Sequence, residues 1–366
     1  MTTNMAGNKV KRILALAAVL CMICLTGCVY KAAGTGASKS AVPGETDDQK
    51  TEADLAVHFI DVGQGDSTLI EANGHYMLID AGEKDQTDTV INYLKAQGVK
   101  SLDYVIGTHP HSDHIGGLEG VIREFDVKNV LLPEKEHTTR IYEKLLDAIA
   151  DKNLKVTIPE VGESCSLGEA SFQIISPSRD YGDNLNNWSI GIRLVYGETS
   201  FVLCGDAEKE AEQDILLSGL PLKADVLKVS HHGSSTSSSP EFINAVSPRY
   251  AVISCGKNND YGHPHKETLD LLKKQGINVL RTDQLGTIVI ESDGTGLRIP
   301  GQPGASKQPE ETDTVREYII NTNTGKFHLP DCKLAKSIKE ENRERYTGTR
   351  EELINKGLEP CKSCNP

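Results

Sequence analysis

Residues 108–114 read Thr-His-Pro-His-Ser-Asp-His, and an Ile-Gly-Gly run follows directly. The stretch comes just after the apolar residues 104–106, which predict a strand that ends at the rim of a sheet. The first two histidines are two positions apart, so in extended backbone their side chains face the same way and can hold one ion. The aspartate and the last histidine begin the turn into a helix and suit a second ion close by. The predicted metal ligands here are His109, His111, Asp113 and His114.

A polar surface loop that is merely rich in histidine is the alternative interpretation. It predicts no Gly-Gly turn, no preceding buried strand and no matching ligands further along the chain, and the sequence contains all three. Asp206 follows the apolar run 201–204 and a glycine. Two adjacent histidines follow the apolar run 226–229, and two more flank Pro264 at the start of a predicted helix. The pattern of an apolar strand followed by a potential ligand therefore repeats, and a metal centre is the favoured interpretation.

The later histidines are given separate roles. We assign His231 to the metal and His232 to catalysis, although the sequence does not rank the two. His263 is expected to be the last metal ligand, and His265 is expected to protonate the leaving group. Lys228 is a candidate for holding an anionic oxygen of the substrate, although a lysine at a strand end is more often solvated. The expected catalytic residues are Asp113, His232, His265 and Lys228.

Six motifs in order resemble the metallo-β-lactamase-fold hydrolases and, more narrowly, the extracellular nuclease domain of DNA-uptake competence channel proteins. They are FIDVGQGDS at 59–67, LIDAG at 78–82, THPHSDH at 108–114, CGD at 204–206, ADVLKVSHHGS at 224–234 and YGHPH at 261–265. The resemblance implies two divalent ions, zinc or manganese, bridged by Asp206 and sharing a hydroxide that attacks the substrate. It also implies that Asp80 orients the metal-binding histidines without binding metal itself.

The sequence departs from many enzymes of this fold at one position. They place a third histidine on the first metal, between the central motif and the bridging acid, and here the only histidine in that interval is His137, beside charged residues. Residues 184–189 stand in the expected place, where the competence-type domains also have asparagine and serine. We expect Asn187 and Ser189 to support the ligands from behind. The first metal is then weakly held, or its site suits a harder ion such as manganese.

Strands and helices alternate from about residue 55 to about residue 293, first with helices between strands and later mostly as strands. Two mixed sheets with helices on their outer faces give an αββα sandwich in the α/β (α+β) class. The predicted domain boundaries are a signal peptide at 1–27, a tether at 28–54, the hydrolase domain at 55–293, a linker at 294–315 and a small metal-binding module at 316–366.

The amino terminus resembles that of a bacterial lipoprotein. Three basic residues precede an apolar run from Ile13 to Thr26, which is too short to span a membrane as a helix. Cys28 follows Leu-Thr-Gly, so cleavage before it would leave a lipidated cysteine at the new terminus. An ordinary signal peptide or a single anchor is the alternative. The prediction is a protein outside the cytoplasm, anchored by lipid to the outer face of the bacterial cell membrane.

The carboxyl-terminal residues contain two close ligand pairs. His328 and Cys332 form the first pair, and Cys361 and Cys364 form the second after a helix-like stretch. This spacing is typical of a structural zinc site. The segment resembles the zinc-binding module of Ada-type DNA-repair proteins, with a histidine in place of the first cysteine. A disulfide is the alternative outside the cell, but three cysteines would leave one unpaired.

These observations leave three functional hypotheses. The first is a membrane-tethered phosphodiesterase with two metal ions, most simply a nuclease that cleaves DNA or RNA. The second is a hydrolase of cell-wall phosphodiesters, such as phosphocholine on teichoic acid, or of an ester or lactone. The third is a surface binding protein without catalysis. The net charge of −13 opposes global attraction to nucleic acid, so binding would be local. The protein is expected to bind the membrane through lipidated Cys28 and a nucleic acid or another phosphodiester as substrate. No obligate protein partner is expected.

Overall fold

A computed structural model describes residues 54–300, 316–330, 332–361 and 364. The predicted signal peptide at 1–27, lipidated Cys28 and almost all of the predicted tether at 28–54 lie outside the described residues. Most of the predicted linker at 294–315 lies outside them as well. Within the described part of the chain, no helix is both long and apolar enough to cross a membrane.

The first sheet of the hydrolase domain begins as an antiparallel meander and continues as parallel strands. Its order is β15-β14-β1-β2-β3-β4-β5-β6. Pairing is antiparallel from β15 to β3 and parallel from β3 to β6. The strands are β1 (Leu55–Phe59), β2 (Thr68–Ala72), β3 (His75–Ile79), β4 (Ser101–Ile106), β5 (Asp126–Leu131), β6 (Val156–Thr157), β14 (Ile288–Ser292) and β15 (Leu297–Arg298).

The second sheet repeats this division in the order β13-β12-β11-β10-β9-β8-β7. Strands β7 to β10 pair antiparallel, whereas β10 to β13 pair parallel. The strands are β7 (Ser164–Leu167), β8 (Ala170–Ser176), β9 (Gly191–Tyr196), β10 (Thr199–Leu203), β11 (Val226–Lys228), β12 (Tyr250–Ile253) and β13 (Asn278–Arg281).

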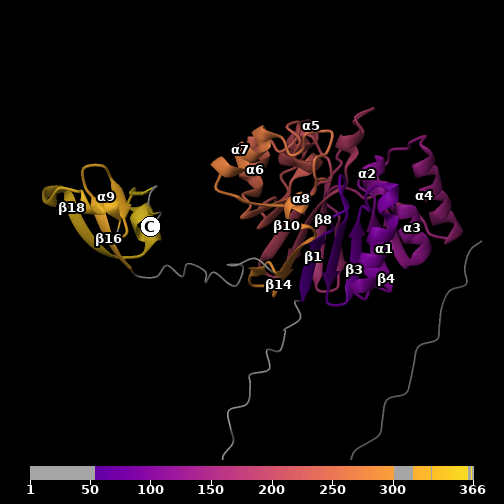
Figure 1. Ribbon diagram of the computed structural model, residues 1–366, viewed down its shortest axis with the longest axis horizontal. Helices are drawn as coiled ribbons and strands as arrows, with labels where there is room; N and C mark the ends of the chain where they lie inside the picture. Colours follow the sequence, from indigo (N-terminus) through magenta and orange to yellow (C-terminus); the bar gives the residue numbers. More distant parts are fainter. Residues whose placement is uncertain (1–53, 301–315, 331, 362–363, 365–366) are drawn as a thin grey trace, which may run out of the picture. The chain divides into compact units, whose positions relative to one another are not determined.

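Helices cover the outer face of each sheet, on opposite sides of the sandwich (Figure 1). Parallel strands require crossover connections, and these helices supply them. The first sheet carries α1 (Thr87–Ala96), α3 (Leu118–Glu124) and α4 (Arg140–Asp151), and the second carries α5 (Lys209–Leu217), α6 (Pro240–Val246) and α7 (Lys266–Lys274). Two of them begin with a side-chain cap: Thr139 accepts from the backbone N–H of Tyr142, and Ser239 from that of Phe242.

Three apolar layers hold these elements together. Between the sheets lies a core that includes Phe59, Phe172 and Phe201. Alternate residues of the same strands face outward: in β4, Ile106 faces the inner core, whereas Val105 packs under the helices. A separate outer layer joins the second sheet to its own helices. The predicted αββα sandwich is therefore confirmed.

The first sheet continues past the predicted end of the hydrolase domain. Residues 297–298 pair with Glu291 and Ser292, and Ile299 is buried in the core between the sheets. Strand β7 was also not predicted, because Ser164–Leu167 carries little apolar signal of its own. Strands β7 and β15 are short edge strands that form because a neighbouring strand pairs with them. The β-propensity of their own residues does not predict such strands.

The carboxyl-terminal module has its own small sheet, in the order β18-β16-β17-β19. The predicted helix-like stretch between the two ligand pairs divides into α9 (Lys333–Lys336), β18 (Arg343–Gly348) and α10 (Arg350–Asn355). The remaining strands are β16 (Arg316–Asn321), β17 (Lys326–His328) and β19 (Glu359–Pro360). A capping box between Thr349 and Glu352 starts α10. The apolar core is small, with Phe327 and Leu353 fully buried.

Candidate metal centre

The candidate ligands lie at the carboxyl ends of strands in both sheets. Asp80 directly follows β3, and the residues 109–114 follow β4 and enter the short helix α2 (Ser112–Ile115). In the second sheet Asp206 follows β10, and the two adjacent histidines follow β11 inside the 3-10 turn η3 (Ser230–Gly233). Parallel strands present their carboxyl ends at one edge of a sheet. Residues far apart in sequence therefore meet at one place.

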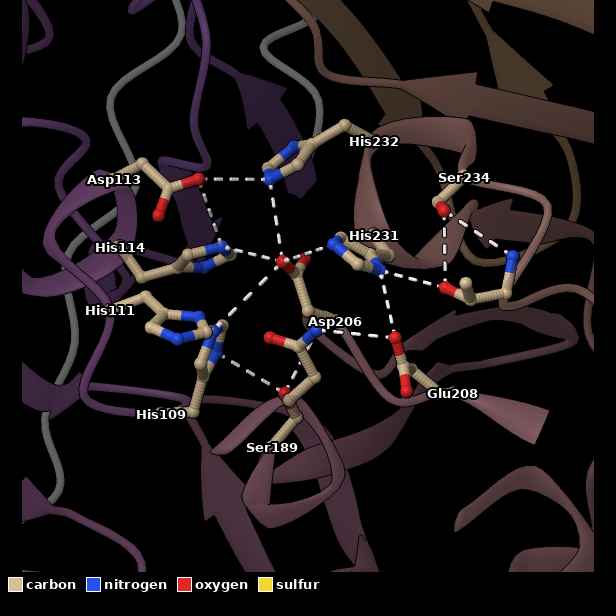
Figure 2. A network of polar contacts seen from close by, with 12 residues as sticks. His109, His111, Asp113, His114, Ser189, Asp206, Glu208, His231, His232 and Ser234 are labelled. Carbon is tan, nitrogen blue, oxygen red and sulfur yellow. Dashed lines mark hydrogen bonds and ion pairs between the residues drawn. The ribbon is translucent and has the colours of Figure 1, made fainter. Parts of the chain in front are cut away.

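Four side chains from the two sheets bring their donor atoms together around Asp206 (Figure 2). His114 Nε2 lies 3.2 Å from Asp206 Oδ2, and His232 Nε2 lies 3.5 Å from the same oxygen. Asp113 Oδ2 is 3.2 Å from His232 Nε2 and 3.7 Å from His114 Nε2. All four donor atoms lie within 4.8 Å of one another. The group Asp113, His114, Asp206 and His232 is called the four-ligand site below.

The donor set fits a divalent cation. His114 Nε2, His232 Nε2 and Asp206 Oδ1 are buried and have no hydrogen-bond partner. Leaving buried polar atoms without partners costs free energy, and both unpaired nitrogens converge on Asp206 Oδ2, so the cluster favours a bound cation. Two imidazole nitrogens with two carboxylates suit zinc or manganese. Asp113 is 25% exposed, so one side of the site is open to solvent.

The electrostatics of the site agree with a missing positive charge. Burial raises the pKa of Asp206, but His114 and His232 outweigh burial and hold the pKa well below its usual value. Burial lowers the pKa of His114 and of His232, but the surrounding carboxylates, Asp206 foremost, raise both well above the usual range. The buried carboxylates thus favour a cation at this site.

Proton release on metal binding is the first expected outcome. The raised pKa of His114 and His232 means that both imidazoles carry protons at neutral pH, whereas a metal needs their neutral form. Metal binding at pH 7 should therefore release protons, and affinity should rise with pH until the raised pKa values are passed. Calorimetric titration with Mn²⁺ or Zn²⁺ in buffers of different ionisation enthalpy measures the release. An identical binding enthalpy in every buffer would contradict it.

Asp80 contacts His114 from the side opposite the four-ligand site. Its Oδ2 accepts a hydrogen bond from His114 Nδ1 at 2.8 Å. Thr108 fixes the carboxylate in turn, since its N–H donates to Oδ1 at 2.8 Å and its hydroxyl to Oδ2 at 2.7 Å. The carboxylate therefore leaves His114 Nε2 as the nitrogen that faces the four-ligand site.

His232 is held in the same manner by groups that the sequence analysis did not identify. Its Nδ1 donates to the carbonyl oxygen of Ser254 at 3.0 Å, and Asp66 Oδ1 lies 3.3 Å from the same nitrogen. Burial raises the pKa of Asp66, but Lys228 and His232 outweigh burial and lower it. Asp66 lies in a glycine-rich loop, where an aspartate serves as often to cap a turn as to border a site. Only its contacts in the structure show that it lies beside His232 and Lys228.

Lys228 differs from its predicted roles, both the contact with a substrate oxygen and the solvated strand end. Its side chain is 3% exposed, and its Nζ lies 2.6 Å from Asp66 Oδ2. Nζ also donates to the carbonyl oxygen of Val229. A buried ammonium that already has an ionic partner is not available to a substrate. Lys228 instead links β11 of the second sheet to the loop after β1 of the first.

Replacing Asp80 with asparagine should weaken metal binding about 10- to 100-fold, because partners of ligating histidines typically contribute that much. Asparagine keeps the shape of the side chain but removes the charge that accepts from His114. Calorimetric titration of the variant with Mn²⁺ gives the affinity. Asp103→Asn is the matched control, since Asp103 Oδ2 lies 3.2 Å from His75 Nδ1 away from the centre. Equal affinities for the two variants would contradict the role of Asp80.

His109 and His111 lie beside the four-ligand site and are not part of it. Their Nε2 and Nδ1 atoms are 2.9 Å apart, and His109 Nε2 is 3.9 Å from Asp206 Oδ2. Burial, with a contribution from His114, holds the pKa of His109 well below its usual value, so its ring is neutral. The structure therefore places a histidine pair next to Asp206.

Ser189 and Asn187 support this region from behind, as the sequence suggested. Ser189 Oγ accepts from the backbone N–H of Asp206 at 3.0 Å and lies 3.3 Å from His109 Nδ1. Asn187 Oδ1 accepts from the N–H of Glu208 at 2.9 Å, and its Nδ2 donates to Glu210 at 3.2 Å. Ser189 thus touches a candidate ligand, whereas Asn187 fixes the backbone just after Asp206. His137, the one histidine between the central motif and Asp206, does not belong to this region. Its Nδ1 lies 3.1 Å from the hydroxyl oxygen of Thr139, which is exposed.

The assignments of His231 and His232 exchange places in the structure. His232 belongs to the four-ligand site, whereas His231 Nε2 is 3.8 Å from Asp206 Oδ2 and its Nδ1 faces Thr236 and Glu208. Both histidines have left-handed backbone, each with φ of 52°. This turn conformation aims successive side chains in directions that a strand or helix period does not predict. Glu208, 3.4 Å from His231, was also not identified from the sequence.

His263 and His265 do not join the four-ligand site. His263, predicted as the last ligand, lies behind His232 with its ring centroid 6.2 Å from that ring. His265 Nδ1 accepts from the backbone N–H of Ser235 at 2.9 Å, and its ring is 4.8 Å from that of His263. Among the described residues, the grouped donors include neither histidine.

The carboxyl-terminal module contains a second group of candidate ligands. His328, Cys332, Cys361 and Cys364 place one donor atom each within 4.8 Å of one another. Cys332 Sγ lies 3.6 Å from His328 Nδ1, and the three cysteines are present as thiols. One nitrogen and three sulfurs in two close pairs suit tetrahedral zinc. The structure thus brings together the four residues that the spacing had paired.

Comparisons with known proteins identify several relatives of this chain. The chain is 38% identical over 250 residues to ComE operon protein 3 of Bacillus subtilis (strain 168), which covers 63% of this chain and 32% of the relative. It is 30% identical over 247 residues to Competence protein ComA of Neisseria gonorrhoeae, which covers 65% and 32%. The chain spans about a third of the length of these curated relatives.

A solved structure, Igni18, a metallo hydrolase from Ignicoccus hospitalis KIN4/I, aligns with a TM-score of 0.45 and 17% identity over 64% of this chain and 99% of that one. Residues 60–257 match the metallo-beta-lactamase superfamily, and they include the four-ligand site with its supporting carboxylates. Because this match spans more than half of the chain, the chain belongs to the metallo-beta-lactamase superfamily and has the fold of its metal-dependent hydrolases.

Proposed function

We propose that this protein is a metal-dependent phosphodiesterase that cleaves DNA or RNA outside the cytoplasm. The observation that carries the proposal is the convergence of two buried imidazole nitrogens and two carboxylates on one point at the carboxyl ends of the strands. The competence proteins among its relatives support nucleic acid as the substrate. Because the chain spans about a third of those relatives, the substrate is inferred from the matched domain alone.

The residues of the centre divide the work of hydrolysis. Asp113, His114, Asp206 and His232 would hold a divalent cation, which supplies Lewis acidity and lowers the pKa of water. Asp113 borders the solvent, so a phosphodiester can approach from its side. His231, kept in place by Glu208, faces the same carboxylate of Asp206 and is placed to hold a proton near the leaving group.

A second cation is part of the proposal. His109 and His111 would hold it with Asp206, which would then lie between two ions. Because residues 184–189 contain asparagine and serine where many such enzymes have a histidine, we expect this site to lack that nitrogen donor. We expect the second ion to bind more weakly and to favour manganese over zinc.

A groove beside Trp188 favours a second candidate function. It measures about 700 Å³ and carries the carboxylates of Glu134, Glu160 and Asp180. Arg179, also in the groove, is already paired with Glu210 and Asp214. Carboxylates there would repel a nucleic-acid backbone and attract a cationic headgroup such as choline. Hydrolysis of phosphocholine on cell-wall teichoic acid is therefore the second candidate, and esters or lactones would fall under the same test.

Anchoring belongs to the same proposal. A lipidated Cys28 would tether the enzyme to the outer face of the cell membrane, where extracellular nucleic acid is accessible. The carboxyl-terminal module, with ten basic and eight acidic residues from Val315 onward, would provide a local contact for nucleic acid in an otherwise acidic protein. Radiolabelled palmitate that is incorporated into the wild type but not into a Cys28→Ala variant would support the anchor.

A single set of digests tests the proposal. The form lacking residues 1–28 would be incubated with plasmid DNA, single-stranded DNA, RNA, phosphocholine esters, a carboxylic ester, a lactone and bis-p-nitrophenyl phosphate, each with Mn²⁺ or Zn²⁺. Cleavage of nucleic acid supports the first candidate. Cleavage of phosphocholine esters alone would support the second candidate, hydrolysis of phosphocholine on cell-wall teichoic acid. If no substrate is cleaved while the metal binds, the protein is a binding protein without catalysis.

A further inference from the structure

We propose that Tyr261 is a stacking platform for an unpaired nucleobase next to the cleaved phosphodiester, which makes single-stranded nucleic acid the preferred substrate. This inference rests on the proposed nuclease function and makes it more specific. It comes from a column of aromatic rings that leads from the protein surface to the metal centre.

The column contains three rings. The Tyr261 ring lies 5.6 Å from that of His263 with an angle of 22° between their planes. The His263 ring in turn lies 6.2 Å from that of His232, at 28°. His232 places its Nε2 beside Asp206 and Asp113. A base stacked on the outer face of Tyr261 would therefore extend the column and bring its own backbone to the rim of the centre.

The outer face of Tyr261 is open. The residue is 67% exposed, and among the large apolar side chains that are exposed in the described part of the chain it is the one aromatic. Scattered exposed aliphatic residues are normal on a protein surface and need no explanation. An exposed ring stacked on His263, which in turn stacks on His232 of the four-ligand site, differs from them, because its location suits a substrate that must reach that site.

The loop that carries Tyr261 is fixed by hydrogen bonds. Asn259 accepts from the N–H of His263 at 2.9 Å and donates to the carbonyl oxygens of His263 and Gly256 at 2.6 and 2.9 Å. The N–H of Gly256 donates to Gln64 in the loop of the first sheet at 3.1 Å. The platform is thus held in position before substrate binds, which lowers the entropy lost on binding.

The chemistry points to a single strand. Every base has a flat face that can stack on an aromatic ring, so such a platform binds without sequence preference. In a duplex both faces of a base are already covered by its neighbours. A base in a single strand, or at a frayed end, has a free face. Stacking on Tyr261 would therefore favour single-stranded over double-stranded substrate.

The test uses the full-length protein in detergent, loaded with Mn²⁺, and two single-stranded oligonucleotides of equal length. One has ordinary bases, and the other has abasic tetrahydrofuran units in the central positions. We expect Tyr261→Ala to raise KM for the ordinary oligonucleotide about tenfold, with little change in kcat. It should leave KM for the abasic oligonucleotide unchanged. Tyr261→Phe keeps the ring and should behave as the wild type does.

Controls separate stacking from damage to the centre. Leu217→Ala removes another exposed apolar side chain, on α5. It should leave KM unchanged for both oligonucleotides. Mn²⁺ content and melting temperature should be equal in all variants. Equal KM values for wild type and Tyr261→Ala on the ordinary oligonucleotide would overturn the inference while leaving the nuclease function standing. A wild type that cleaves bis-p-nitrophenyl phosphate but neither oligonucleotide would remove the nuclease assignment, and the inference with it.

Discussion

Asp206→Asn is expected to lower hydrolysis about a thousandfold and to remove bound metal, because four of the candidate histidines face this one carboxylate. His109, His114, His231 and His232 each lie within 3.9 Å of its Oδ2. Losing several kcal/mol of cation binding at the reacting centre corresponds to about three powers of ten in rate. Initial rates on the substrate identified in the digests, together with metal content by mass spectrometry, provide the measurement.

The choice of substitution and a control variant make this test decisive. Asparagine keeps the volume of the side chain and can still accept a hydrogen bond, so the variant is expected to fold. Asp147→Asn changes an exposed acid on α4 and should retain full activity and metal. If Asp206→Asn kept both the rate and the metal of the wild type, the chemistry would have to lie elsewhere, and the assignment of the centre would be wrong.

Cys332→Ser is expected to unfold the carboxyl-terminal module and to remove one equivalent of zinc. The apolar core of the module is small, with Phe327, Leu353 and a few neighbours, so burial alone supplies little stability. Structural zinc in modules of this size contributes about 10–16 kcal/mol of apparent binding free energy, which becomes folding free energy. Limited proteolysis should then cut within 316–366 in the variant, or in the wild type after treatment with a chelator.

The zinc count is best made in an Asp206→Asn background, so that metal in the hydrolase domain does not contribute. Cys165→Ser is the matched control, because Cys165 lies in β7, outside the module. Sensitivity to a reducing agent rather than to a chelator would show that a disulfide stabilises the module. A module that stays protease-resistant without metal would show that its apolar core is sufficient.

The positions of the main ligands could be predicted because each follows an apolar strand. Asp80, His109 and Asp206 each come shortly after an apolar run that forms a strand. A short apolar run that ends in polar residues is a typical sequence pattern of a buried strand, so the sequence reveals where each strand ends. The sandwich followed from the same strands and from the helices between them. Long, strongly patterned segments carry their structure in local sequence, so the sequence predicts them.

The supporting contacts could not be predicted in the same way. The pairs His232–Asp66 and His231–Glu208 join residues from different elements, and neither residue carries a local signal of its partner. The left-handed backbone of the histidine pair also reverses the expected directions of the two side chains. Lys228 was assigned to solvent or substrate because a lysine at a strand end is usually exposed. Its burial depends on Asp66, which reaches it from the other sheet.

The four-ligand site takes its donors from both halves of the sandwich. Asp113 and His114 follow β4 of the first sheet, whereas Asp206 and His232 follow β10 and β11 of the second. A cation bound by all four would cross-link the two halves, so neither could open locally without releasing it. The metal-loaded form would then resist proteases that cut the empty form. Metal supply would decide how long each molecule survives as well as whether it is active.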